Sequence, residues 1–169
     1  MSASLAIQPM IRLGNGLDFH RLIINDKRPL ILGGLVIESE YALEGHSDAD
    51  VVLHALSDAL LGALAGPDIG ELFPDTDAAI KGIDSKLILA RALSFITDAN
   101  FNIANVDITI IGERPKIKLH KEAIRQRIAG LLHVAIDQVG LKATTTEKMG
   151  SLGRGEGLGC LATALLVRS

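Results

Sequence analysis

Hydrophobic positions recur along this chain with two different periods, and each period predicts a different kind of element. Apolar residues return at helical spacing over residues 51–63, 85–100 and 119–134. Alternation with a period of two, or a short apolar run bounded by glycine, proline or charge, predicts a strand. The predicted strands cover residues 10–15, 29–37, 103–111, 139–146 and 160–167.

Polar and glycine-rich segments separate these elements. Ser47 or Asp48 is predicted to cap the first helix, and Asp84 or Ser85 the second, because short polar side chains satisfy free helix N–H groups. Residues 17–28 have no clear pattern. We expect a mobile polar loop over residues 38–48, an acidic loop over 66–77, a glycine-rich segment over 150–159 and a bend at the Gly-Gly pair within 29–37.

This order of elements predicts a mixed β-sheet with helices packed on one face, an α+β or α/β architecture. The chain has 169 residues, which favours one domain. We expect residues 1–10 to form a disordered leader and residues 11–169 a single catalytic domain.

Composition narrows the class of protein. The net charge of −3 and the low aromatic content, 3%, argue against a nucleic-acid binder. No apolar run is long enough to cross a membrane. Cys160 stands alone and the start of the chain lacks a secretory pattern, so we expect a cytoplasmic protein. A plastid protein from which a targeting leader was removed is the alternative.

Three residues could form a metal site. In extended backbone Asp18 and His20 project to one side while Phe19 turns inward, although a lone pair of this kind more often belongs to a solvated polar loop. His54 lies in an apolar helix, where a histidine is usually a core residue, but Asp50 and Asp58 share its helix face and could fix its tautomer. One carboxylate and two imidazoles with an open fourth position are typical of catalytic zinc.

Other polar clusters suit phosphate chemistry. His46 and Ser47 precede a helix N-terminus, which attracts anions, though Ser47 could simply cap that helix. The threonines at 144–146 could hold phosphate oxygens, and Glu147, beside Lys148, could hold magnesium. The acidic loop and the basic turn at Arg114 are equally consistent with ordinary surface.

Four blocks together resemble one enzyme family along residues 11–167. They are GNGLDFHRL, EGHSDADVVLHALSDALLGALAGPDIGELFPDTD, NVDITIIGERPKI and KATTTEKMGSLGRGEG. The chain is similar to the 2-C-methyl-D-erythritol 2,4-cyclodiphosphate synthases, phosphorus–oxygen lyases of non-mevalonate isoprenoid (terpenoid) biosynthesis. The resemblance implies cyclisation of 4-diphosphocytidyl-2-C-methyl-D-erythritol 2-phosphate with release of CMP.

The resemblance also implies roles for individual residues. Asp18, His20 and His54 would hold zinc, and Glu147 a magnesium or manganese ion on the diphosphate. His46 and Ser47 would contact the methylerythritol phosphate with Asp75 nearby, Asp68 and Gly70 the ribose, and Lys148 would lie near the phosphates. The cytosine would be held by Gly112, Arg114, Pro115, Lys116, Ile117, Lys118, Thr144 and Thr145.

The family forms homotrimers with the sheets facing the threefold axis and each active site between two subunits. One subunit would supply the zinc and ribose residues, and its neighbour the cytosine loop and Glu147. Relatives can hold an isoprenoid diphosphate at the axis, near Arg154. Here Ser151 replaces a residue that is often apolar or aromatic, which leaves that binding open.

Two other functions remain as alternatives. A zinc-dependent phosphoesterase would give an open phosphate in place of a cyclic diphosphate. A non-catalytic trimeric binder of nucleotides or isoprenoid diphosphates would leave the substrate intact, but it would not need an open three-ligand metal set.

Overall fold

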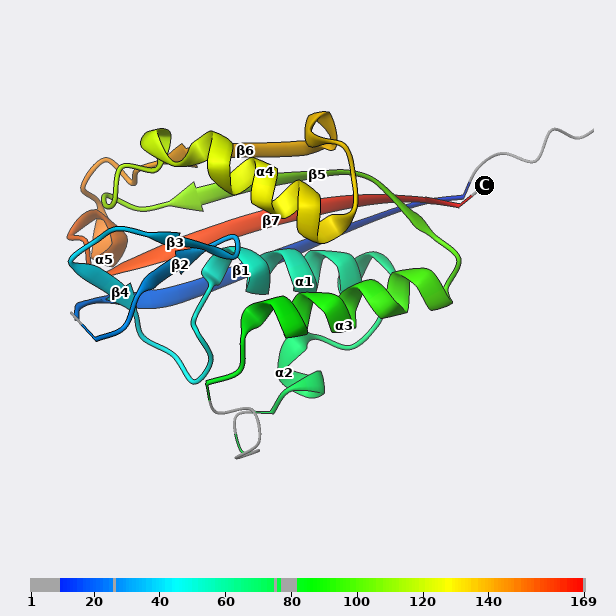
Figure 1. Cartoon of the computed structure of the whole chain (residues 1–169), viewed down its shortest axis with the longest axis horizontal. Helices are drawn as coiled ribbons and strands as arrows, with labels where there is room; N and C mark the ends of the chain where they lie inside the picture. Colours follow the sequence, from blue (N-terminus) through cyan, green and yellow to red (C-terminus); the bar gives the residue numbers. More distant parts are fainter. Residues whose placement is uncertain (1–9, 26, 75, 77–81, 169) are drawn as a thin grey trace, which may run out of the picture.

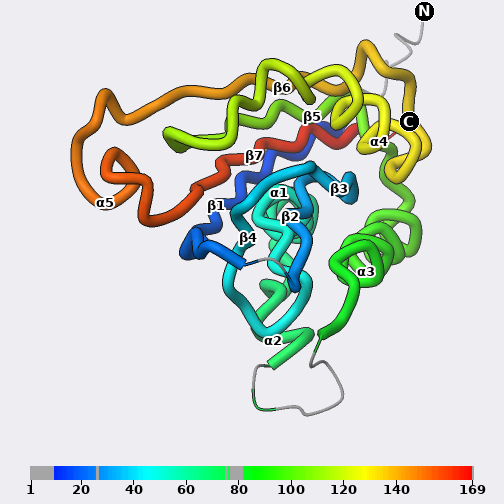
Figure 2. The backbone as a smooth tube through the Cα atoms, turned by 60° about the vertical axis from the view of Figure 1, so that its left-hand side comes forward, coloured from blue at the N-terminus to red at the C-terminus, as the bar shows by residue number. Residues whose placement is uncertain are grey.

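The computed structural model describes residues 10–25, 27–74, 76 and 82–168. A five-stranded mixed sheet has the order β4-β1-β7-β5-β6, and β2 and β3 form a separate hairpin. Figure 2 shows α1, α3 and α4 on the same side of the large sheet. The predicted mixed sheet with helices on one face is confirmed, and the described core residues form one hydrophobic cluster.

The strands are more numerous than the sequence pattern predicts, and β1, β5 and β7 are longer. They are β1 (Met10–Ile24), β2 (Leu30–Leu32), β3 (Leu35–Ile37), β4 (Tyr41–Leu43), β5 (Asn102–Ile111), β6 (Val139–Thr144) and β7 (Gly157–Arg168). β5 and β6 are parallel, and the other pairs of the large sheet are antiparallel.

The helices follow the predicted helical spacing, with shorter ones added. They are α1 (Val51–Ala63), α2 (Ile69–Leu72), α3 (Ser85–Asp98), α4 (Lys121–Leu132) and α5 (Gly150–Gly153), with 3-10 turns η2 (Ile117–Leu119) and η3 (Ile136–Gln138). Figure 1 shows α1 lying along β1, with α3 beside α1. None of the described helices is long and apolar enough to span a bilayer.

Several sequence expectations are wrong because tertiary pairing decides the structure. Within the segment 17–28, which has no readable pattern, residues 17–24 continue β1 by pairing with β7 and then β4. The expected mobile loop 38–48 contains β4, and the acidic and glycine-rich loops contain α2 and α5. The expected single strand over 29–37 is a hairpin, with Gly33 and Gly34 both at positive φ. Met10, expected in the leader, begins β1, and residues 1–9 lie outside the described residues.

β1 and α1 approach each other very closely, and the residues on both are small enough to allow it. A Cβ added at Gly14 would lie 2.1 Å from Ala59 O, and one at Gly16 would lie 2.0 Å from Ala55 O. Such contacts leave no room for a side chain larger than hydrogen at these two positions. The pair of glycines therefore sets how near α1 comes to β1.

The opposite face of β1 is apolar and exposed in the single chain. Leu13, Leu17 and Phe19 are 67%, 54% and 54% exposed, and Leu17 pairs with Leu161 of β7, which is also exposed. Phe19 was expected to turn inward, but it projects to this uncovered face because residues 18 and 20 occupy the helix side. A stripe of this kind is typical of a protein–protein contact.

We expect Gly16→Ala to lower the free energy of unfolding by about 1–3 kcal/mol, since the backbone of α1 must shift to admit the methyl group. Gly130→Ala is the matched control: Gly130 is exposed in α4 with no atom within 4 Å of an added Cβ. It should raise the free energy of unfolding by about 0.5–1 kcal/mol. Urea unfolding of both variants measures this, and equal stabilities would contradict the close approach.

Candidate active site

Asp18 and His20 continue the row of small residues on the helix side of β1. Alternation along a strand places residues 14, 16, 18 and 20 on one face. Because Gly14 and Gly16 face Ala59 and Ala55, the two polar residues lie opposite the beginning of α1. His54 lies in the first turn of that helix. The strand and the helix thus bring a carboxylate and two imidazoles together from positions distant in sequence.

The three ligand atoms form a nearly equilateral triangle. His20 Nε2 lies 3.0 Å from Asp18 Oδ2, His54 Nδ1 lies 3.1 Å from the same oxygen, and the two nitrogens are 3.1 Å apart. In tetrahedral zinc sites with bonds of about 2.0–2.1 Å, neighbouring ligand atoms are separated by about 3.3 Å. The predicted convergence of Asp18, His20 and His54 is confirmed, and the triangle has the size that a zinc ion needs.

The carboxylate and the imidazoles of this cluster shift each other's pKa values. Burial alone would raise the pKa of Asp18, but the neighbouring imidazoles of His20 and His54 outweigh it and hold the pKa well below its ordinary value. Burial alone would lower the pKa of His20, but the carboxylate of Asp18 raises it above its ordinary value. An ionised carboxylate beside two imidazoles is a suitable site for a divalent cation.

The carboxylates expected to orient His54 do something else. Asp50 accepts hydrogen bonds from Val52 N and Leu53 N as the cap of α1. Asp58 Oδ1 accepts one from Ile69 N at 2.9 Å. Among the described contacts neither carboxylate bonds to the His54 ring, so the prediction that they fix its tautomer is wrong. The capping role expected of Ser47 or Asp48 likewise belongs to Asp50.

A cavity of about 390 Å³ opens beside the metal triangle. His46, Ser47 and Gly70 contribute to its wall together with the three ligand residues. Asp68 caps α2 by accepting a hydrogen bond from Glu71 N at 2.8 Å and lines a neighbouring hollow with Asp58. Asp75 lies outside the described residues. In the part of the chain that the structure describes, no fourth carboxylate, imidazole or thiol joins the triangle.

The other expected substrate residues gather at a different place. Gly112 N donates to Thr144 O at 3.0 Å, where β5 and β6 end side by side, and Thr145 Oγ1 donates to Glu147 Oε1 at 3.0 Å. Lys148 N donates to Glu113 Oε1 at 3.2 Å. None of them lines the cavity at the triangle, and Figure 2 shows the neighbouring α5 and the acidic-loop helix α2 at separate edges of the molecule.

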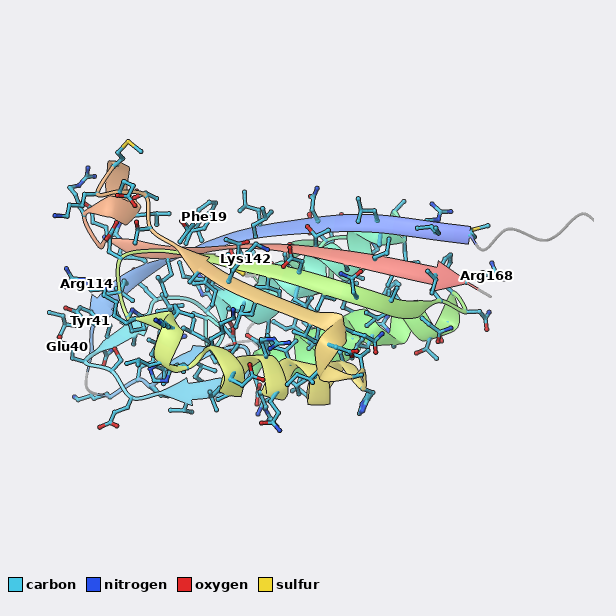
Figure 3. All side chains as sticks on the ribbon, turned by 90° about the horizontal axis from the view of Figure 1, so that it is seen from above. Phe19, Glu40, Tyr41, Arg114, Lys142 and Arg168 are labelled. Atoms are coloured by element: carbon cyan, nitrogen blue, oxygen red, sulfur yellow. The ribbon has the colours of Figure 1, made fainter. Side chains whose placement is uncertain are left out.

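Two residues of the expected cytosine loop, and Arg154 outside it, have their side chains in contact with other parts of the chain. Arg114 Nη1 donates to Tyr41 Oη at 2.6 Å, and Figure 3 shows the two side chains next to each other. Ile117 is buried in the core, which leaves its backbone as the part available to a ligand. Arg154 Nε lies 2.6 Å from Glu156 Oε1 on the surface. The remaining loop residues, Pro115, Lys116 and Lys118, lie between β5 and α4.

Comparison with known proteins now identifies the family. The sequence model of the YgbB family matches residues 11–167. The chain belongs to the YgbB family. The 2-C-methyl-D-erythritol 2,4-cyclodiphosphate synthase of Leptospira borgpetersenii serovar Hardjo-bovis is 59% identical over 160 residues, which cover 95% of this chain and 99% of that protein.

Solved structures of similar proteins share the fold of this YgbB-family chain. The bifunctional IspDF from Campylobacter jejuni superposes with a TM-score of 0.90 at 40% identity, over 96% of this chain and 43% of that longer one. The CDP complex of IspF from Plasmodium falciparum gives a TM-score of 0.83 at 34% identity, over 94% and 97% of the two chains.

Sequence reasoning missed Arg28 at this YgbB-family site. Its guanidinium donates to Gly45 O at 3.0 Å and to Ser47 O, so it holds the segment that carries His46 and Ser47. No sequence signal distinguishes Arg28 from the surface charges around it, because its partners are backbone carbonyls. Asp48 and Ser85 were noticed only as candidate caps, although both prove to contact groups at the site.

Asp50 fixes the beginning of α1, which carries His54. Besides capping the helix, its carboxylate accepts hydrogen bonds from Gly33 N at 2.9 Å and Gly34 N at 2.6 Å. Burial raises the pKa of Asp50 to about 6, against the effect of the N–H groups that favour the ionised form. One buried carboxylate therefore joins the β2–β3 turn to the helix that presents the third ligand.

We expect Asp50→Ala to lower the free energy of unfolding by about 3 kcal/mol or more, because four N–H groups lose their acceptor. Asp84→Ala is the control, since Asp84 caps α3 through a single N–H, that of Lys86; its loss should cost about 1 kcal/mol. Chemical denaturation of both variants compares the costs. Equal losses would mean that Asp50 is no more than an ordinary cap.

Proposed function

We propose that this chain converts 4-diphosphocytidyl-2-C-methyl-D-erythritol 2-phosphate to 2-C-methyl-D-erythritol 2,4-cyclodiphosphate and CMP. The observation that carries the proposal is the triangle of Asp18, His20 and His54, which opens on a cavity also lined by His46 and Ser47. Membership of the YgbB family supports the same reaction. So does the match to a relative named as this synthase, which covers nearly its whole length.

The donor atoms suit the two metals that the reaction needs. Asp18, His20 and His54 would hold zinc, because one oxygen and two imidazole nitrogens at tetrahedral spacing are ligands that it prefers. Glu147 would hold magnesium or manganese, which binds one or two carboxylates together with substrate phosphates. When bound, the two ions offset the charge on the phosphates and hold them in position.

The reaction requires little general acid–base catalysis from the protein. An oxygen of the 2-phosphate forms a bond to the β-phosphorus while the bond from that phosphorus to the CMP oxygen breaks. The nucleophile is already an anion, CMP leaves with the bonding electrons as a stable anion, and neither water nor a proton is consumed. The remaining obstacles are repulsion between anions and the entropy of ring closure.

The chain's own residues address these obstacles by position. His46 and Ser47 hold the phosphate end of the substrate in the cavity. Gly70 and the carboxylate of Asp68 bind the ribose, with Asp75 as a further expected contact. Holding both phosphates in line can supply roughly 7–11 kcal/mol of the barrier in a well-oriented intramolecular reaction.

We propose that a neighbouring subunit supplies the cytosine and diphosphate contacts in a homotrimer. The substrate residues from Gly112 to Lys118, with Thr144, Thr145, Glu147 and Lys148, lie outside the cavity at the triangle. The exposed apolar stripe on β1 and β7 gives copies of the chain a surface on which to associate. An isoprenoid diphosphate at the threefold axis, near Arg154, and a cytoplasmic location stay predictions.

The activity is tested by incubating the full chain with zinc, magnesium and the proposed substrate, and by following the products with ³¹P NMR. We expect CMP and a cyclic diphosphate. His54→Ala should lose zinc and reduce turnover by about 100-fold or more, because several kcal/mol of charge stabilisation leave with the metal. His133→Asn, which removes an exposed imidazole at the end of α4, is the control and should leave both unchanged.

The same measurement separates the alternatives. An open phosphate product would indicate the phosphoesterase, and binding of CDP without consumption of the substrate would indicate a binding protein. Full activity in a His54→Ala protein shown to be free of zinc would contradict the role of the metal.

Shared sites are tested by mixing two inactive variants. Trimers assembled from equal amounts of His54→Ala and Glu147→Ala should regain about a quarter of the activity, since one site in four would combine an intact triangle with an intact neighbouring loop. Mixing His54→Ala with Asp18→Ala is the control and should restore nothing. Confirmed mixed assembly without recovery would mean that each site lies within one subunit.

A further inference from the structure

The ring nitrogen of His54 that faces away from the metal triangle has a defined partner. Its Nε2 lies 2.8 Å from Ser85 Oγ and 3.2 Å from Ser47 Oγ. Ser85 is the first residue of α3 and is completely buried, and His54 is 7% exposed. Water therefore cannot replace Ser85 as the partner of this nitrogen, and the protein itself decides which ring nitrogen carries the proton.

Ser85 is in turn held by Asp48. Its hydroxyl donates to Asp48 Oδ1, and its backbone N–H donates to Asp48 Oδ2 at 3.1 Å. Asp48 N donates to Ile83 O at 3.1 Å, so the start of α3 is fixed to the segment before α1 at three points. A hydroxyl donating to a carboxylate forms a charge-assisted hydrogen bond, which is stronger than a neutral one.

The donors and acceptors around Ser85 indicate the tautomer of His54. An ionised carboxylate only accepts, and a serine hydroxyl has one hydrogen to give. Because the hydrogen of Ser85 goes to Asp48, Ser85 Oγ can only accept from His54 Nε2. A hydrogen bond between Ser85 Oγ and His54 Nε2 therefore requires the proton of the neutral imidazole on Nε2, and the lone pair of Nδ1 is then directed at Asp18 and His20.

His20 shows the opposite arrangement. Its Nδ1 donates to Glu44 O at 2.8 Å, which leaves Nε2 as the nitrogen at the triangle. The two imidazoles thus present different nitrogens, each selected by a hydrogen bond on its far side. For His20 the selecting group is a backbone carbonyl, which no side-chain substitution removes. For His54 it is a side chain, and a variant can test it.

We propose that Asp48 and Ser85 are positioning residues that hold His54 in the tautomer and orientation able to bind the metal through Nδ1. The inference rests on the proposed metal site and goes beyond the ligands themselves. It also assigns the hydroxyl of Ser47. Since Ser85 takes the Nε2 proton and Ser47 Oγ accepts from Ala49 N at 2.9 Å, the hydrogen of Ser47 remains for a phosphate in the cavity.

The test measures zinc affinity and tautomer in the full chain. Ser85→Ala should weaken zinc binding by about 10–100-fold, the usual effect of removing a group that orients a ligating histidine. Ser57→Ala is the matched control: Ser57 is also completely buried, and its hydroxyl donates to Leu53 O at 2.7 Å within the same helix as His54. It should leave zinc affinity unchanged, as measured by competition with a chelator.

A spectroscopic readout separates positioning from a loss of packing. In zinc-loaded protein labelled with ¹⁵N-histidine, we expect the proton of His54 on Nε2 and the metal on Nδ1. Asp48→Asn, which can donate as well as accept, frees Ser85 to donate to Nε2. In the chelated protein this variant should therefore show an increased share of the Nδ1–H tautomer.

The outcomes are distinguishable. Wild-type zinc affinity in folded Ser85→Ala, or a proton on Nδ1 in the wild-type holoprotein, would overturn the positioning role while the metal site stands. If the wild-type protein bound no zinc, and His54→Ala changed nothing, both the positioning role and the proposed zinc site would be overturned.

Discussion

The close contact between β1 and α1 is the constraint on which the rest of the structure depends. Gly14 and Gly16 let the backbone of Ala55 and Ala59 approach to a distance that any side chain would prevent. One step further along the strand the glycines give way to Asp18 and His20, whose side chains occupy the space that opens toward the first turn of α1. The same approach that packs the core therefore sets the size of the metal triangle.

The polar groups around the triangle form a second layer that determines direction. Glu44 O and Ser85 each take the far nitrogen of one imidazole, while Asp50 and Arg28 hold the helix start and the loop that present His54 and Ser47. Most of these contacts join segments that are far apart in sequence. A site whose ligands come from a strand and a helix needs such cross-connections, because packing alone leaves side-chain orientation free.

The sequence predicts the ligands better than it predicts their support. Asp18, His20 and His54 stand out because their residue types are those of zinc sites, and the period-two rule places the first two on one face. The main helices and β5 follow from periodicity. β4 and the second half of β1 do not, since their strand structure comes from pairing with each other and with β7. Helical spacing predicts that Asp50 and Asp58 contact His54, but both carboxylates bind groups outside the helix. Asp50 accepts from the glycine turn, and Asp58 accepts from Ile69 N.

Because β1 is pleated, its two faces contact different surroundings. Even-numbered positions from Gly14 to His20 face the helix, and odd-numbered ones such as Leu13, Leu17 and Phe19 form the exposed apolar stripe. An insertion of a single residue ahead of Leu17 would exchange the two sets, sending large apolar groups against α1 and turning Asp18 and His20 out to solvent. A change in the length of this strand therefore alters the exposed stripe and the metal triangle together, whereas a substitution at Leu13, Leu17 or Phe19 changes the stripe alone.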